Sequence, residues 1–142
     1  MSERVITVAE FEDRLAALCL DGPGSAFPRR DRDRQILYRS IVQSLEVRKN
    51  YSEPMMNAAL QQWLSSIGTN MNIDHVTLRR YLVDEAYLVR DLKGSVYSVN
   101  LPGRGRIEFE QAVADIDSMT VIQDAKARVA ARKRERAMRA KP

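Results

Sequence analysis

The chain's only histidine stands beside a pair of arginines in the stretch "DHVTLRRYLVDE", which runs from Asp74 to Glu85. A histidine can act as a general base or as a metal ligand, and arginines can bind phosphate groups or the edges of DNA bases. The stretch is therefore compatible with catalysis, metal binding or nucleic-acid recognition. It is equally compatible with a well-packed helix that binds no ligand. The rest of the sequence must distinguish among these hypotheses.

Metal binding and catalysis find little support elsewhere in the chain. A zinc site needs three or four ligands, and the sequence has one histidine, His75, and one cysteine, Cys19. The sequence also lacks a nucleophile elbow and a phosphate-cradling glycine loop. We therefore predict no metal ion, no cofactor and no catalytic residue, and we expect a protein that is not an enzyme. A hydrolase or transferase that uses His75 is the less favoured alternative.

The elements before this stretch are predicted from capping residues and helical periodicity. Thr7 and Glu10 have the spacing of a capping box, and the apolar residues after them predict a first helix from about Val8 to Leu20. Cys19 falls among its apolar positions, so we expect a buried thiol without a disulfide. A second helix is predicted from apolar residues four positions apart, Leu37, Ile41 and Leu45.

Two further helices and a hairpin complete the central part of the chain. Ser52 is placed to cap a third helix, and Gly68 suits the left-handed position that closes a helix. Asp74 is placed to cap the fourth helix, which contains the arginine pair. Two short apolar runs then flank a turn at Lys93 to Ser95, which predicts a β-hairpin. This order predicts a mainly helical α+β fold with a winged helix-turn-helix core over residues 27–100.

Helical extensions are predicted on both sides of this core. Residues 1–22 form the N-terminal extension and residues 107–142 the C-terminal one, in which a short helix is expected from Phe109 to Ile116. A last helix is indicated by its apolar residues, Met119, Ile122 and Val129. From about Arg132 the apolar stripe stops, so we expect the tail to lose helical order.

The net charge of +4 is unevenly distributed. From Lys126 to the end, 8 basic residues and 1 acidic residue give +7, whereas the remaining 15 basic and 18 acidic residues give −3. Electrostatic attraction to nucleic acid is therefore predicted for the tail and not for the globular part. Because the sequence has no apolar run of membrane-spanning length and no export signal, we expect a cytoplasmic protein without membrane contact.

Three short motifs accompany these elements. They are F-P and a basic run at Phe27 to Arg30, Y-S-E at Tyr51 to Glu53, and D-H-x-x-L-R-R-x-L-V-D at Asp74 to Asp84, with Tyr97 in the hairpin. Together they resemble a bacterial domain family of unknown function, found alone or attached to transcription-regulator domains. The chain departs from that pattern in Asp31 and Asp33 within the basic run and in a longer connection before the last motif. The resemblance implies a winged-helix-like fold and a regulatory setting, without a known activity.

A helical projection assigns Arg79 to the edge of the buried face of the fourth helix. Advancing about 100° per residue places Leu82 beside Leu78 on the buried side and Arg79 on its flank. The stem of Arg79 is then expected to pack while its guanidinium finds an acid. We predict that Arg79 is a structural anchor, with Glu53 and Asp91 as candidate partners.

The outward face of the same helix carries few groups that could contact DNA. Thr77 and Arg80 face outward, and Arg80 has the i, i+4 spacing of an ion pair with Asp84. Other cations lie in the hairpin turn, in the tail and in the "GRGR" loop, whose two arginines are candidates for a flexible arm along a minor groove. The residues predicted to contact nucleic acid are His75, Thr77, Arg80, Lys93, Arg104, Arg106, Arg128, Arg132, Lys133, Arg134 and Arg136.

We therefore predict a winged-helix regulatory protein that binds nucleic acid, with DNA favoured over RNA. The tail and loop are expected to supply affinity without sequence preference, and the fourth helix and hairpin to supply modest selectivity. The alternative is a protein-interaction or dimerisation module that uses the winged helix as a scaffold. In that case a partner or a second copy pairs with apolar residues of the terminal helices, Phe11, Leu15, Leu18, Met119, Ile122 and Val129.

Overall fold

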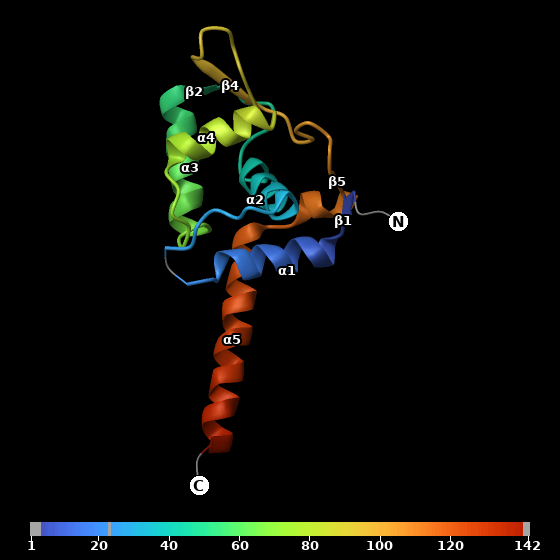
Figure 1. The fold of residues 1–142 in the computed structure, drawn as a ribbon, viewed down its shortest axis with the longest axis vertical. Helices are drawn as coiled ribbons and strands as arrows, with labels where there is room; N and C mark the ends of the chain where they lie inside the picture. Colours follow the sequence, from blue (N-terminus) through green and yellow to red (C-terminus); the bar gives the residue numbers. More distant parts are fainter. Residues whose placement is uncertain (1–3, 23, 141–142) are drawn as a thin grey trace.

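A computed structural model describes residues 4–22 and 24–140 (Figure 1). Its elements in chain order are β1 (Val5–Ile6), α1 (Val8–Cys19), α2 (Asp31–Gln43), β2 (Tyr51–Ser52), α3 (Glu53–Ser66), α4 (His75–Asp84), β3 (Leu88–Arg90), β4 (Val96–Val99), β5 (Glu108–Phe109), the 3-10 helix η1 (Gln111–Asp115) and α5 (Ser118–Ala140). These residues form a mainly helical fold with small sheets, so the predicted α+β class is confirmed. None of the described helices is long and apolar enough to cross a membrane.

Side-chain caps start three of the helices at the predicted residues. Thr7, Ser52 and Asp74 cap α1, α3 and α4, and each side-chain oxygen accepts a hydrogen bond from the backbone N–H three residues later, at 3.2, 3.3 and 2.7 Å. Each bond satisfies an N–H that the first helical turn leaves without a partner. The helix starts therefore follow from local sequence.

The predicted hairpin is present and carries a third strand. β3 and β4 pair antiparallel with Arg90 opposite Tyr97, and β2 pairs with the other edge of β4. Gly94 has a φ of 69° in the turn, a conformation that glycine adopts without strain. The third strand was missed because a two-residue strand is too short to show an alternating pattern.

One hydrophobic core joins the terminal helices to the central elements. Leu78 and Leu82 of α4 are fully buried in it, as the helical projection predicted. Phe11 and Leu15 of α1 are fully buried in the same core, and Ile122 of α5 is 2% exposed. These three side chains had been assigned to a partner or a second copy in the alternative hypothesis, and that assignment is wrong because the chain's own core covers them.

Three other sequence predictions are also wrong. Gly68 is not among the residues with a positive φ; it lies against the ring of Trp63 instead. The segment from Phe109 to Ile116 divides between β5, which pairs with β1, and η1. The tail beyond Arg132 remains helical to Ala140, because Ala, Arg, Lys and Met are strong helix formers even where no apolar stripe is buried.

Burial of Cys19 and Tyr38 predicts a loss of stability at alkaline pH. Cys19 is 5% exposed, as expected from the sequence. Burial raises the pKa of the Cys19 thiol to about 12, and burial raises the pKa of the Tyr38 hydroxyl to about 12. Both folded-state pKa values lie above the unfolded values of 9.0 and 10.0. Their contribution is thus complete below about pH 9 and is lost as the pH rises toward 12.

Urea unfolding followed at a series of pH values above neutrality tests this expectation. The unfolding midpoint should fall steadily from about pH 9 upward. In the Cys19→Ala variant the decline should begin about one pH unit later, when tyrosine ionisation takes over. A midpoint that stays level through this range would contradict the assignment of these groups to the core.

Candidate nucleic-acid interface

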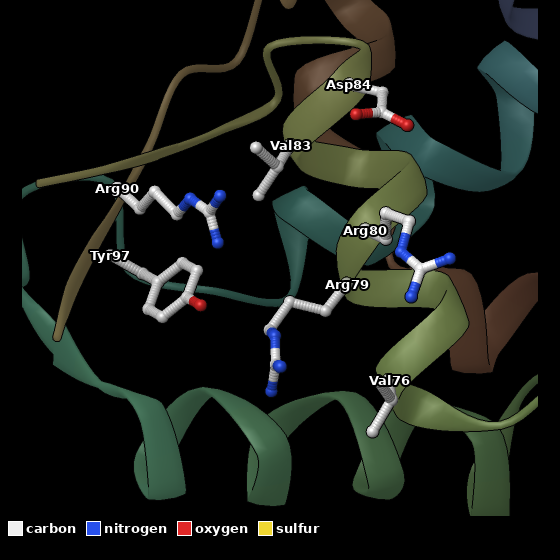
Figure 2. Close-up of a pocket in the computed structure, with 7 residues that line it drawn as sticks. All are labelled: Val76, Arg79, Arg80, Val83, Asp84, Arg90 and Tyr97. Atoms are coloured by element: carbon white, nitrogen blue, oxygen red, sulfur yellow. The ribbon is translucent and has the colours of Figure 1, made fainter. Parts of the chain in front are cut away.

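A groove of about 340 Å³ separates α4 from the β3–β4 hairpin. Figure 2 shows the side chains that line it, Val76, Arg79, Arg80, Val83, Asp84, Arg90 and Tyr97. The α4 residues among them are spaced i, i+3, i+4, i+7 and i+8, so they form one face of the helix. This face is turned toward the hairpin, while the opposite face is packed into the core.

Arg79 is held by protein groups inside this groove. Its Nη2 lies 3.3 Å from Oε1 of Glu53, the partner expected from the sequence, and its Nη1 donates a hydrogen bond to Asn57. The guanidinium also lies 5.8 Å from the centre of the Tyr97 ring. With the side chain 17% exposed, Arg79 ties α4 to α3 and to the hairpin, the anchoring position that the projection indicated.

Asp91, the other candidate partner of Arg79, belongs to the hairpin turn. Its Oδ1 accepts hydrogen bonds from the backbone N–H groups of Ser95 and Val96, at 2.8 and 3.2 Å. The bonds from Val96 and Ser95 lower the pKa of the Asp91 carboxyl. Its carboxylate is therefore used to close the turn, and the prediction that it pairs with Arg79 is wrong.

Arg80 and Arg90 line the same groove and differ from Arg79 in having no partner among the described residues. In the described part of the chain, neither guanidinium has a hydrogen bond or an ion pair. Figure 2 shows Arg80 directed away from Asp84, so the surface ion pair suggested by their spacing does not form. Arg90 extends from β3 toward α4. The groove thus combines one anchored arginine with two that are available to a ligand.

Arg90 was missed by the sequence analysis. A signal for it exists in the alternation of the hairpin, because residues two apart on a strand share a face. Leu88 is buried and Arg90 follows it by two, opposite the buried Tyr97. Leu88 and Arg90 therefore share one face of β3, with Leu88 in the core and Arg90 beside α4. The position of Arg90 beside α4 becomes apparent only once the pairing register is known.

His75 and Thr77 lie in the first turn of α4, outside the groove lining. His75 Nδ1 accepts a hydrogen bond from Nε2 of Gln61, at 3.3 Å, so the imidazole is attached to α3. Thr77 donates its backbone N–H to Asp74, and its side chain is half-buried. Across residues 4–22 and 24–140, no three His, Cys, Asp or Glu side chains gather where they could hold a metal ion.

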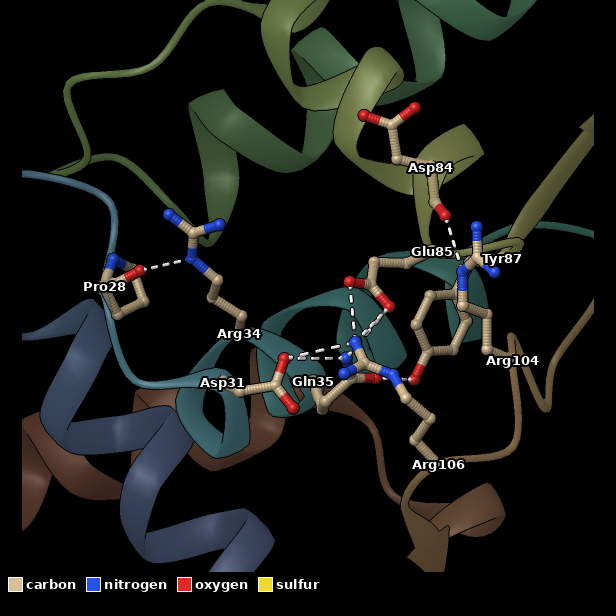
Figure 3. Close-up of polar contacts among 9 residues, drawn as sticks. All are labelled: Pro28, Asp31, Arg34, Gln35, Asp84, Glu85, Tyr87, Arg104 and Arg106. Carbon is tan, nitrogen blue, oxygen red and sulfur yellow. Dashed lines mark hydrogen bonds and ion pairs between the residues drawn. The ribbon is translucent and has the colours of Figure 1, made fainter.

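The "GRGR" loop does not form a free arm. Figure 3 shows Arg104 donating from Nε to the Asp84 carbonyl, at 2.8 Å, and Arg106 donating from Nη2 to both carboxylate oxygens of Glu85, at 2.6 and 2.8 Å. Arg106 also lies 3.5 Å from Asp31 of α2. These guanidiniums hold the C-terminal end of α4, where cations are favoured by the helix dipole. The hypothesis that they enter a minor groove is therefore not supported.

The basic tail and the groove lie at opposite ends of the molecule. Figure 1 shows the hairpin at one end of the longest axis and the C-terminal half of α5 at the other. Lys93 lies in the hairpin turn and is exposed. The tail cations predicted from the sequence are all exposed along α5, namely Arg128, Arg132, Lys133, Arg134 and Arg136. The structure therefore brings Arg80, Arg90 and Lys93 to one end and leaves the tail apart from them.

Comparison with known proteins identifies the central part of the chain. Neither a search of curated proteins nor a search of solved structures returned a match. A family model described as "uncharacterized protein conserved in bacteria (DUF2087)" matches residues 25–99. The match runs from α2 to β4 and includes the whole lining of the groove, whereas α1 and α5 lie outside it. It covers more than half of the chain, which therefore belongs to this family of bacterial proteins, as its motifs had indicated.

Proposed function

We propose that this protein is a regulatory DNA-binding protein that holds duplex DNA at the groove between α4 and the hairpin. The observation that carries the proposal is the pair Arg80 and Arg90, which line one open groove from two different elements and have no protein partners among the described residues. A guanidinium that is not paired with an acid is available for a phosphate oxygen, and such contacts dominate affinity for DNA. A binding role also needs no catalytic residues, and the sequence shows no recognised catalytic motif.

The order and pairing of the elements support this assignment. The chain runs α2, β2, α3, α4, β3, β4, with α3 and α4 packed together and the sheet in the order β2, β4, β3. We assign this arrangement to the winged helix-turn-helix class, in which the second helix of the pair enters the major groove and the first crosses the backbone. In this assignment α4 is the recognition helix and the β3–β4 hairpin is the wing.

Each group near the groove has a distinct place in the proposed complex. Arg80 and Arg90 bind DNA phosphates on the two sides of the protein groove between α4 and the hairpin. Lys93 at the hairpin tip adds a third cation. Thr77 and His75 stand in the first turn of α4, the part of a recognition helix that reaches base edges. Arg79 contributes indirectly, because its bonds to α3 and its contact with the Tyr97 ring hold α4, α3 and the hairpin together. The tail, at the other end of the molecule, takes no part in this complex.

Replacing Arg80 and Arg90 is expected to weaken DNA binding strongly. Each single change to alanine should lower the affinity about tenfold at low salt and reduce the slope of log affinity against log salt by about 1. The double variant should lose about a hundredfold, because the two groups bind separate phosphates. Fluorescence anisotropy with a labelled duplex over a salt series measures both quantities.

Two matched variants separate the groove from other basic surfaces. The double change Arg29→Ala and Arg30→Ala removes two exposed arginines, of which Arg30 lies near Glu10 of α1, and should leave the affinity almost unchanged. A second variant changes Arg132, Lys133, Arg134 and Arg136 to glutamine and removes the tail charge. If that variant lost DNA binding while the groove variants kept it, the proposed site would be wrong and the tail would be the binding element.

A further inference from the structure

A second surface lies where α5 passes the C-terminal end of α1, far from the groove between α4 and the hairpin (Figure 1). Two adjoining hollows of about 460 and about 290 Å³ share Leu20 and Val129 as lining. We call the combined lining the α1–α5 surface; its residues are Asp13, Ala16, Ala17, Leu20, Ala125, Lys126, Arg128, Val129, Ala130, Arg132 and Lys133.

The floor of the α1–α5 surface is apolar and shallow. Leu20 and Val129 are half-buried, and the floor between them is made of alanines of both helices. Because alanine side chains are small, larger side chains of a partner have room to pack against them. A floor of this kind suits an amphipathic helix, which lays an apolar face into a groove through residues at helical spacing.

The rim of the α1–α5 surface is strongly basic. It carries four cations, all exposed, and within residues 4–22 and 24–140 none of them has a hydrogen bond or an ion pair. They are Lys126, Arg128, Arg132 and Lys133. Among the described residues that line the two hollows, Asp13 is the one acid. The electrostatic complement of this rim is an acidic ligand.

We propose that the α1–α5 surface binds an acidic amphipathic helix of a partner protein. The apolar floor would receive the anchor side chains of the partner, and its glutamates or aspartates would pair with the four cations of the rim. A second copy of this chain fits poorly, because it would bring another basic rim against the first with a single Asp13 on each side to compensate. A nucleic acid would satisfy the rim but would leave Leu20 and Val129 uncovered.

This proposal does not depend on DNA binding, since the two surfaces have no described residue in common. It extends the function to recruitment: one end of the molecule would hold DNA while the other end holds an acidic protein segment. The family match covers the first surface and neither helix of the second. Recruitment would then be a property of the segments that flank the family domain in this chain.

The test uses the full chain and a labelled synthetic peptide with leucines at helical spacing and glutamates on the flanks. Two control peptides have lysine in place of glutamate, or serine in place of leucine. We expect the glutamate–leucine peptide to bind and both controls to bind at least about tenfold more weakly. The double change Arg132→Glu and Lys133→Glu should weaken peptide binding about tenfold or more, and Val129→Ser should weaken it as well.

A matched variant and two further measurements keep the proposal falsifiable. The double change Arg29→Glu and Arg48→Glu reverses two exposed arginines outside this surface and should leave peptide affinity within about twofold. Because Arg132 and Lys133 are exposed, their variant should keep the wild-type circular dichroism spectrum. The proposal is overturned if the glutamate–leucine peptide does not bind better than its controls. It is also overturned if Arg132→Glu and Lys133→Glu weaken duplex DNA binding but leave peptide binding intact, or if light scattering shows a dimer that Val129→Ser dissociates.

Discussion

Replacement of Trp63 by alanine is expected to lower the free energy of unfolding by about 3–5 kcal/mol. Trp63 is 2% exposed, and its Nε1 donates a hydrogen bond to Ser40 Oγ at 3.1 Å. Ser40 Oγ in turn lies 2.6 Å from Ser118 Oγ. The indole therefore fills the core and links α3 to α2 and to the start of α5. Its removal leaves a cavity and weakens a buried polar chain.

Gly68 supplies a matched test of the same contact. A Cβ on Gly68 would lie 2.4 Å from Cζ3 of Trp63, so Gly68→Ala should cost about 1–3 kcal/mol through overpacking. In a Trp63→Ala background the same change meets no ring and should cost much less. The two changes are therefore expected to be strongly non-additive, as contacting residues are.

Urea unfolding followed by circular dichroism measures this cycle. Fluorescence is unsuitable, because Trp63 is the only tryptophan of the chain. If Gly68→Ala cost the same free energy with and without the indole, the close approach of Trp63 would not be the reason for glycine at this position.

Gly103→Ala is the second change for which we expect a large effect. Gly103 has a φ of 58°, and a Cβ there would lie 2.8 Å from two ring carbons of Tyr87. Tyr87 is 1% exposed and donates its hydroxyl to Gln35, so the ring cannot move aside freely. The left-handed backbone costs an alanine about 1–2 kcal/mol and the overlap about 1–3 kcal/mol, so we expect a loss of about 2–4 kcal/mol in total.

Gly105 provides the control within the same loop. Its φ is 74°, but a Cβ at this position would meet no atom of the described residues within 4 Å. Gly105→Ala should therefore show only the backbone cost, about 1–2 kcal/mol. Urea unfolding followed by Trp63 fluorescence compares the two variants. Equal losses at the two glycines would refute the contribution of the Tyr87 contact.

Much of the fold could be predicted because its signals are local. Thr7, Ser52 and Asp74 cap helices through hydrogen bonds that reach three residues along the chain, and a sequence shows such spacings directly. The buried face of α4 was predicted from Leu78 and Leu82 for the same reason. Gly68 shows the limit of local rules. A glycine after a helix suggested a left-handed cap, but glycine stands at this position because the indole of Trp63 leaves no room for a side chain.

The candidate site was predicted only in part. The projection of α4 identified Arg80 as exposed and placed Arg79 at the edge of the core. The spacing of Arg80 and Asp84 also suggested an ion pair, yet a flexible surface pair gains little free energy and does not form here. Arg104 and Arg106 were predicted to form a free basic arm, but Asp84 and Glu85 bind them. These partners lie about 20 residues earlier in the chain, and the sequence does not show that the fold brings them together.

The sequence by itself determined the helix starts, the hairpin turn, the α+β class and the family, because each depends on neighbouring residues and their periodicity. Only the tertiary structure decided which cations remain available. The strand register places Arg90 beside α4. Arg104 and Arg106 are bound by a backbone carbonyl and by carboxylates. The basic tail lies on α5, at the opposite end of the molecule from the hairpin. Charge is visible in a sequence, but a cation is available to a ligand only where the folded chain supplies no acid to neutralise it, and that depends on contacts between residues far apart in the chain.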